Sequence, residues 1–133
     1  MIECIVLGDS IAVGTAHFRP ECVALAKSGI NSRDWNKQNR NNPVAAGTVI
    51  ISLGSNDTKD IRTIWEVTQL RERVLAEQVF WILPANKPYV AEFIRTVAKD
   101  FGDTVLPIPA KGLSPDGVHP TYSGYRDLAK ATR

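Results

Sequence analysis

Apolar runs rich in branched residues alternate with helical patterns along this 133-residue chain. The runs cover residues 2–7, 22–26, 48–53, 78–83 and 104–108, and each run predicts a buried strand. Strands that alternate with helices favour a parallel sheet with helices on both faces. We therefore expect an α/β fold with three layers, in which one sheet lies between two layers of helices (α/β/α). Its five-stranded, parallel, doubly wound sheet would have the order 2-1-3-4-5 and would form one domain of residues 1–133.

The helical patterns lie between these runs. The clearest covers residues 89–101, where apolar side chains recur every three or four positions and Pro88 suits the first turn. A second extends from about residue 59 to residue 76, and a first short helix begins near Ile11. The last begins after Thr121, a suitable N-cap, and is expected to bury Tyr122, Tyr125 and Leu128.

Composition excludes several classes of function. The formal net charge is +2 and no long block of one sign occurs, so no nucleic-acid partner is indicated. No apolar stretch approaches the ~20 residues of a membrane span. The N-terminal residues lack a basic region and a cleavage site, which predicts a cytoplasmic protein. The sequence does not indicate an oligomeric state.

Cysteine and glycine patterns argue against a metal or an organic cofactor. Cys4 and Cys22 lie in apolar runs and are expected to be buried free thiols in a reducing compartment. Neither Cys-x-x-Cys nor two closely spaced histidines occur, so no zinc site is predicted. The segment 8–15 contains neither a lysine nor a Gly-x-Gly-x-x-Gly pattern, which argues against nucleotide binding.

A serine and the two residue types that can activate it occur at the two ends of the chain. Ser10 follows the first apolar run in Gly8-Asp9-Ser10, and Asp116 precedes His119 by three positions. A serine hydroxyl is a poor nucleophile unless an imidazole takes its proton, and a carboxylate can fix the tautomer of that imidazole. Ser10 could equally be a plain N-cap. Asp116-Gly117 alone could be a structural turn.

The positions of these groups relative to the strands favour a shared site. Gly8-Asp9-Ser10, 28–31, 54–57 and 116–119 each follow a predicted strand. In open α/β sheets, ligands bind beyond the carboxyl ends of the strands. Strands one and five would lie roughly 14 Å apart, and the segment 109–118 can extend about 30 Å, so His119 can reach Ser10. The alternative base, His17, would lie about 10 Å from Ser10 along a shared helix, too far for proton transfer.

At these residues the chain resembles the SGNH hydrolases, also called the GDSL esterase and lipase family. Gly8-Asp9-Ser10 resembles the nucleophile block, Gly29 the second block, Gly54-Ser55-Asn56-Asp57 the third, and Asp116 to Pro120 the Asp-x-x-His-Pro block. All four occur in the family's order. Ile11 replaces the leucine of the name motif, and the chain is shorter than many relatives.

The resemblance implies an SGNH hydrolase fold and a role for each matching residue. Ser10 would be the nucleophile, His119 the base and Asp116 the orienting acid. The backbone amides of Ser10 and Gly29 and the side chain of Asn56 would form the oxyanion hole. Gly29 alone would be read as a turn glycine, and Asp57 is better interpreted as a helix cap.

These residues predict a serine ester hydrolase that forms an acyl-Ser10 intermediate and needs no cofactor. A short chain leaves little material for a lid, which favours small acyl groups such as acetyl, on a small-molecule or carbohydrate ester. Asn86 could line the pocket, and Arg33 or Lys37 could meet an anionic substrate. A lysophospholipase or thioesterase, and a noncatalytic binding module on the same scaffold, remain as alternatives.

Overall fold

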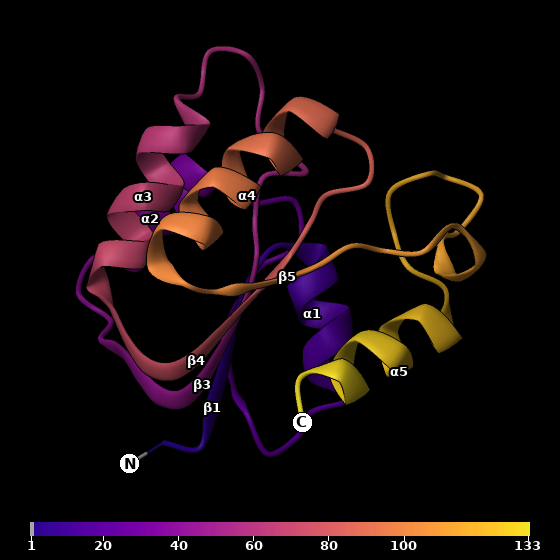
Figure 1. Ribbon diagram of the computed structural model, residues 1–133, viewed down its shortest axis with the longest axis horizontal. Coiled ribbons are helices and arrows are strands. Elements are labelled where there is room, and N and C mark those ends of the chain that lie inside the picture. Colours follow the sequence, from indigo (N-terminus) through magenta and orange to yellow (C-terminus); the bar gives the residue numbers. More distant parts are fainter. Residues whose placement is uncertain (1) are drawn as a thin grey trace.

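A computed structural model describes residues 2–133 as a central parallel sheet between two layers of helices. The sheet has five strands in the order β2-β1-β3-β4-β5, and every neighbouring pair is parallel (Figure 1). This confirms the predicted fold class and strand order. The strands are β1 (Cys4–Gly8), β2 (Val23–Ala26), β3 (Val44–Ser52), β4 (Val74–Ile82) and β5 (Thr104–Leu106).

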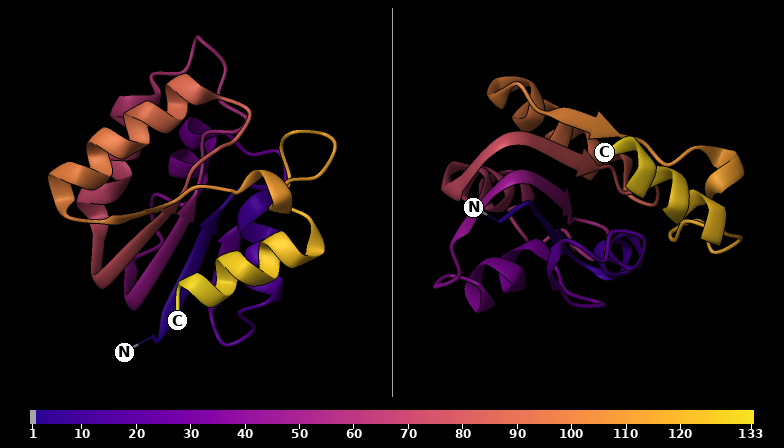
Figure 2. Two further views of the ribbon diagram at one scale, coloured as in Figure 1. Left: turned by 45° about the vertical axis from the view of Figure 1, so that its right-hand side comes forward. Right: turned by 90° about the horizontal axis from the view of Figure 1, so that it is seen from below.

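Each face of the sheet buries its own core. Ile5, Leu7 and Ile51 pack under α2 (Ser32–Gln38), α3 (Thr63–Arg73) and α4 (Pro88–Phe101). Val6 and Ile50 alternate with them and pack under α1 (Ser10–His17) and α5 (Tyr122–Ala131). Figure 2 shows these two helical layers from two further directions. Both faces of the central strands are apolar because successive side chains point to opposite sides and helices cover both.

Two strands begin earlier than their apolar runs predict. β3 begins at Val44 and β4 at Val74, so each has nine residues. Small and polar residues such as Gly47 and Glu77 interrupt the hydrophobic pattern there, yet the backbones of β3 and β4 pair from Val44 and Val74 onward. The predicted helix of residues 59–76 is correspondingly shorter, since α3 spans Thr63–Arg73.

The helices differ from the sequence pattern in two places. α2 was not predicted, because its sequence SRDWNKQ has no apolar stripe and anchors to the core chiefly through the buried Trp35. In α5 Leu128 is buried as expected, but Tyr122 is 72% exposed, so the prediction that the helix buries Tyr122 was wrong. Tyr122 is the first residue of α5 and its ring stacks edge-on against Phe18. A single turn of 3-10 helix, η1 (Ala110–Gly112), precedes the last loop.

Cys4 and Cys22 form a disulfide bond, which corrects the expectation of two free thiols. The cause is strand register. Ile5 pairs with Val23 between β1 and β2, and this brings the two preceding residues, Cys4 and Cys22, opposite one another with their Cα atoms 4.7 Å apart. Such a distance suits a disulfide. The apolar character of both runs predicted burial correctly for Cys4 but carried no information about this register.

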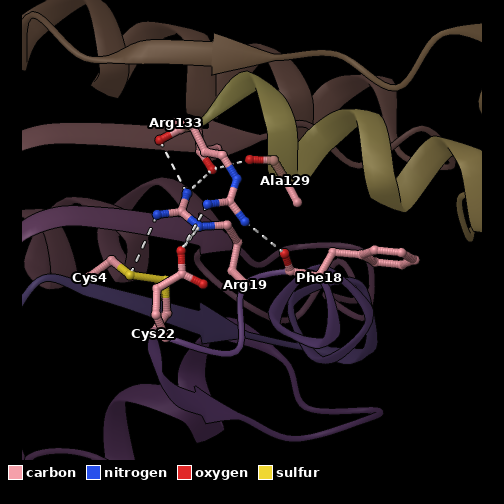
Figure 3. The surroundings of a disulfide bond; sticks show 8 residues. Cys4, Phe18, Arg19, Cys22, Ala129 and Arg133 are labelled. Atoms are coloured by element: carbon pink, nitrogen blue, oxygen red, sulfur yellow. Dashed lines mark hydrogen bonds and ion pairs between the residues drawn. A yellow bond between two sulfur atoms is a disulfide. The ribbon is translucent and has the colours of Figure 1, made fainter.

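A buried arginine connects this disulfide to the C-terminal end of the described chain (Figure 3). The Arg19 guanidinium donates to the Cys4 sulfur at 3.6 Å and to the carbonyl and hydroxyl oxygens of Thr132. Glu21 accepts from both Arg19 and Arg133. These contacts hold the end of α5 against the end of α1. No helix within residues 2–133 has the length and hydrophobicity needed to span a bilayer.

Candidate active site

Ser10 is the first residue of α1, directly beyond the carboxyl end of β1. The turn that delivers it requires Gly8, whose φ is 137°, because a Cβ there would lie 1.8 Å from the Ser52 carbonyl oxygen. Asp9 then caps the helix by accepting from the Ile11 amide at 3.0 Å. Ser10 is thereby fixed at the positive end of α1.

Asp9 is fully buried and connects the loop after β1 to the loop after β3. Its carboxylate accepts from the hydroxyls of Ser55 at 2.8 Å and Ser52 at 3.2 Å, in addition to the cap. Burial raises the pKa of Asp9 above its ordinary value, while the hydrogen bonds from Ser55, Ile11 and Ser52 act in the opposite direction. Neither serine was predicted to have a role, because their contacts depend on the register between two strands.

His119 meets Ser10 although 109 positions separate them. The Nε2 atom of His119 lies 2.8 Å from the Ser10 hydroxyl, and its Nδ1 atom lies 2.8 Å from the Oδ2 atom of Asp116. The other carboxylate oxygen of Asp116 accepts from the backbone amides of Val118 and His119. The structure therefore brings together the three residues that the sequence selected.

The hydrogen bonds at Asp116 determine its charge state. The hydrogen bond with the His119 side chain, followed by those from the His119 and Val118 amides, lowers the pKa of Asp116 from 3.8 to about 2. Asp116 is therefore ionised throughout the neutral range. An ionised carboxylate at Nδ1 favours the tautomer with a proton on Nδ1, which leaves Nε2 free to accept the proton of Ser10.

The loop from η1 to α5 is closed upon itself. The Ser114 amide donates to the His119 carbonyl at 2.8 Å, and the Thr121 amide donates to the Gly112 carbonyl at 2.8 Å. Gly117, at the turn between them, has a φ of 72°, a conformation that favours glycine. These contacts close the loop between η1 and α5 and hold Asp116 and His119 within it.

Three predicted oxyanion donors lie at strand ends on the same edge of the sheet. Within residues 2–133 neither the Ser10 nor the Gly29 backbone amide donates a hydrogen bond to the protein. Asn56 gives one amide hydrogen to the Ile30 carbonyl at 3.0 Å, and its second amide hydrogen has no acceptor among the described residues 2–133. Gly29 has a φ of 83° and a Cβ there would meet nothing within 4 Å, so the surface above it is open.

The loop after β3 holds its neighbours in place. Asp57 is buried and accepts from the Ser32 amide and hydroxyl and from the Thr63 hydroxyl. It therefore bonds the first residue of α2, whose N-cap is Asn31, and the first residue of α3, whose N-cap Arg62 makes no side-chain cap hydrogen bond. The prediction that Asp57 caps the helix that follows it was wrong. Asn86, in the loop after β4, donates to the Ser55 carbonyl at 3.1 Å.

His17 and Tyr125 lie in different surroundings. His17 is exposed and its ring stacks edge-on against Phe18, as expected for a residue outside the site. Tyr125 of α5 was predicted only as a buried residue, yet its pKa is raised by burial and then by the charges of Asp9 and Asp116. A Cβ on Gly14 would lie 2.4 Å from the Tyr125 ring, so α1 and α5 meet closely here.

Within residues 2–133 no group of histidine, cysteine or acidic side chains is arranged to hold a metal ion.

Solved structures share this architecture. A Bacteroides fragilis protein described as a "putative acylhydrolase" matches with a TM-score of 0.69 at 17% identity, covering 97% of this chain and 83% of that one. This chain has an SGNH-like fold. The C-terminal catalytic domain of Streptococcus pneumoniae peptidoglycan O-acetyltransferase A matches with a TM-score of 0.62 at 15% identity, covering 96% of this chain and 88% of the domain. No family model matches the sequence, and no curated protein matches it.

Proposed function

We propose that residues 1–133 form one SGNH-type hydrolase domain that cleaves esters through a covalent acyl-Ser10 intermediate. The observation that carries this proposal is the unbroken series of hydrogen bonds from the Ser10 hydroxyl through both ring nitrogens of His119 to Asp116. A base in contact with the hydroxyl and a carboxylate in contact with the base are what nucleophilic activation of serine requires.

The proposed reaction has two halves. Ser10 Oγ attacks the ester carbonyl carbon while its proton passes to His119 Nε2. The tetrahedral intermediate then collapses, and His119 returns that proton to the departing alcohol. In the second half a water molecule attacks the acyl-Ser10 carbonyl, gives its proton to His119, and the free acid leaves as Ser10 is protonated again. Asp116 stays ionised and stabilises the imidazolium that forms in each half.

Charge on the carbonyl oxygen develops in both halves and needs donors. The Ser10 and Gly29 amides and the second hydrogen of Asn56 have no acceptor in the part of the chain that the structure describes, which makes them available for this oxygen. The N-terminus of α1 adds a favourable dipole at Ser10. Donors fixed before the reaction stabilise a developing oxyanion without reorganisation.

The structural neighbours support this class of chemistry. One is named as an acylhydrolase and the other as an O-acetyltransferase that was solved with a methylsulfonyl adduct. Both names describe the transfer or hydrolysis of an acyl group. They agree with the four sequence blocks and together favour membership of the SGNH hydrolases.

The openness of the site favours small acyl groups. The side chains of His119 and Asp116 are 41% and 50% exposed, and Gly29 is also exposed. A site this open has little apolar wall with which to bind a long acyl chain. We therefore propose acetyl and similarly short esters, including those of carbohydrates, as substrates, with Asn86 at the border of the site as a contact for the alcohol portion.

Hydrolysis of p-nitrophenyl acetate tests this function. Ser10→Ala should lower kcat by roughly 10⁶-fold, because the residues of a triad act as a unit. Ser123→Ala is the matched control, since Ser123 is an exposed serine of α5, and it should retain full activity. Equal rates for the protein and Ser10→Ala would exclude Ser10 as the nucleophile. Absence of turnover in both would favour the noncatalytic binding module.

A series of nitrophenyl esters of increasing chain length separates the remaining alternatives. The open site predicts that kcat/KM is highest for acetate and falls as the acyl chain lengthens. A maximum at long chains would instead favour the lysophospholipase alternative, and preference for a matched thioester would favour the thioesterase.

A further inference from the structure

Ser55 connects two groups that the proposed reaction needs in alignment, the nucleophile and a donor of the oxyanion hole. Its hydroxyl donates to Asp9 Oδ2 at 2.8 Å, and Asp9 immediately precedes Ser10. The next residue after Ser55 is Asn56, whose second amide hydrogen has no acceptor within residues 2–133. Ser55 is only 6% exposed, so its hydrogen bond is shielded from water. The Ser55 side chain therefore links the loop of the nucleophile to the residue that carries the donor.

Ser55 lies beyond the part of β3 that the sheet fixes. β3 ends at Ser52, and residues 53–62 take no part in strand pairing. Among the hydrogen bonds of residues 2–133, the bond from Ser55 to Asp9 is the only one that joins residues 53–57 to residues 8–12. The hydrogen bonding between this turn and the nucleophile loop therefore consists of one side-chain contact.

Two other contacts of the turn lead to different loops. Asn56 donates to the carbonyl of Ile30, the residue after Gly29, which fixes one proposed oxyanion donor to the loop that carries another. The Ser55 carbonyl accepts from Asn86 in the loop after β4. The Ser55 hydroxyl adds the connection to the loop after β1, so hydrogen bonds join all three loops that supply the proposed oxyanion donors.

We propose that Ser55 is a positioning residue, which acts through Asn56 to hold the oxyanion hole at the correct distance from Ser10. This inference rests on the proposed ester hydrolysis. Donors stabilise an oxyanion when they lie about 2.7–3.1 Å from the place that the oxygen will occupy. A displacement of about 1 Å can lower a rate about 100-fold. Ser55 itself does not contact the substrate, because its hydroxyl is buried against Asp9.

Ser52 provides a matched control on the same carboxylate. Its hydroxyl donates to Asp9 Oδ1 at 3.2 Å and it is 3% exposed, so Ser52→Ala and Ser55→Ala each remove one buried hydroxyl from Asp9. Ser52 belongs to β3 and is not adjacent to Asn56, and strand pairing holds it in place without its side chain. We therefore expect both variants to lose stability in urea unfolding, and only Ser55→Ala to lose activity.

Kinetics with p-nitrophenyl acetate test the proposal. Ser55→Ala should lower kcat and kcat/KM together by about 10- to 100-fold, because the oxyanion forms in the transition state and not in the bound ester. Ser52→Ala should retain activity close to that of the natural protein. An unchanged kcat in Ser55→Ala, or an equal loss in Ser52→Ala, would overturn the proposal.

A double-mutant cycle with Asn56→Ala separates an effect on position from a general loss of structure. If Ser55 acts through Asn56, Ser55→Ala should change kcat little once residue 56 is alanine, and the two effects should be strongly non-additive. Equal losses from Ser55→Ala with and without the Asn56 side chain would show that Ser55 acts by another route.

A measurement without turnover distinguishes this inference from the proposed function. The {¹H}–¹⁵N nuclear Overhauser effect of the Asn56 side-chain amide, assigned by its absence from Asn56→Ala, reports how firmly that amide is held. It should fall in Ser55→Ala and be unchanged in Ser52→Ala. An unchanged value in Ser55→Ala would overturn the positioning role. Failure of the natural protein to hydrolyse esters would refute the proposed function, and this measurement would still decide whether Ser55 positions Asn56.

Discussion

Asn56 is the side chain whose proposed role is easiest to isolate, because one of its amide hydrogens is used in the fold and the other is free. Asn56→Ala should lower kcat for p-nitrophenyl acetate about 10²- to 10³-fold, as loss of one oxyanion donor does elsewhere. Asn41→Ala, in the loop at the opposite edge of the sheet, is the control. An unchanged kcat would remove Asn56 from the oxyanion hole. Urea unfolding of both variants checks that the fold is retained.

Asp9 provides a second test at the scale of a single residue. Burial raises the folded-state pKa of Asp9, so folding takes up a proton at this carboxyl group. Its contribution to the free energy of unfolding is therefore fully present below the unfolded pKa of 3.8 and is lost as pH rises through the higher folded value. The group disfavours folding most at neutral pH.

Asp9→Asn removes that titration. Between pH 7 and pH 4 the free energy of unfolding of the natural protein should rise relative to that of Asp9→Asn, measured by urea unfolding at each pH. A constant difference across this range would show that burial does not raise the pKa of Asp9. The comparison with the variant cancels the titration of the other carboxylates.

The sequence was most informative where chemistry and strand ends coincide. The contacts among Ser10, His119 and Asp116 could be predicted because each residue follows a strand of a parallel sheet, and the carboxyl ends of such strands share one edge. The partners of Asp9 could not be predicted in the same way. Ser52 and Ser55 are ordinary polar residues in the sequence, and only the pairing of Gly8 with Ser52 brings them to Asp9.

At the scale of elements, the disulfide between the start of β1 and the residue before β2 makes a stability prediction. It closes a loop with a sequence separation of 18, which corresponds to about 3 kcal/mol of stabilisation in the chain-entropy description. Cys4→Ala/Cys22→Ala should therefore lower the free energy of unfolding by about that amount. Reductant should destabilise the natural protein and leave the variant unchanged. Equal stability of the natural protein with and without reductant would contradict the pairing.

Element boundaries illustrate what periodicity alone misses. The long helix α4 was predicted almost to the residue because its apolar stripe is continuous and Pro88 marks its start. The seven-residue α2 was not, since Trp35 is its only large buried residue. Two polar contacts fix it: its own N-cap Asn31 accepts from the Asp34 amide, and the distant Asp57 accepts from Ser32. The contact with Asp57 is tertiary and does not appear as a pattern in the sequence.

At the scale of the whole molecule, the sheet order gathers both ends of the chain into one site. Ser10 follows the interior strand β1, and His119 crosses back to it from the loop beyond the edge strand β5. Arg19 holds the end of α5 against the end of α1, so the segment that carries His119 is anchored on both sides of the loop. The candidate site therefore depends on the complete fold and not on any one motif.

Mass spectrometry of the protein quenched during turnover of p-nitrophenyl acetate tests the central claim most directly. A covalent mechanism predicts one acetyl group per chain, located on Ser10 by peptide mapping and absent from Ser10→Ala. His119→Ala should also fail to accumulate it. Steady turnover with Ser10 unmodified, or with the acetyl group on another residue, would contradict the account.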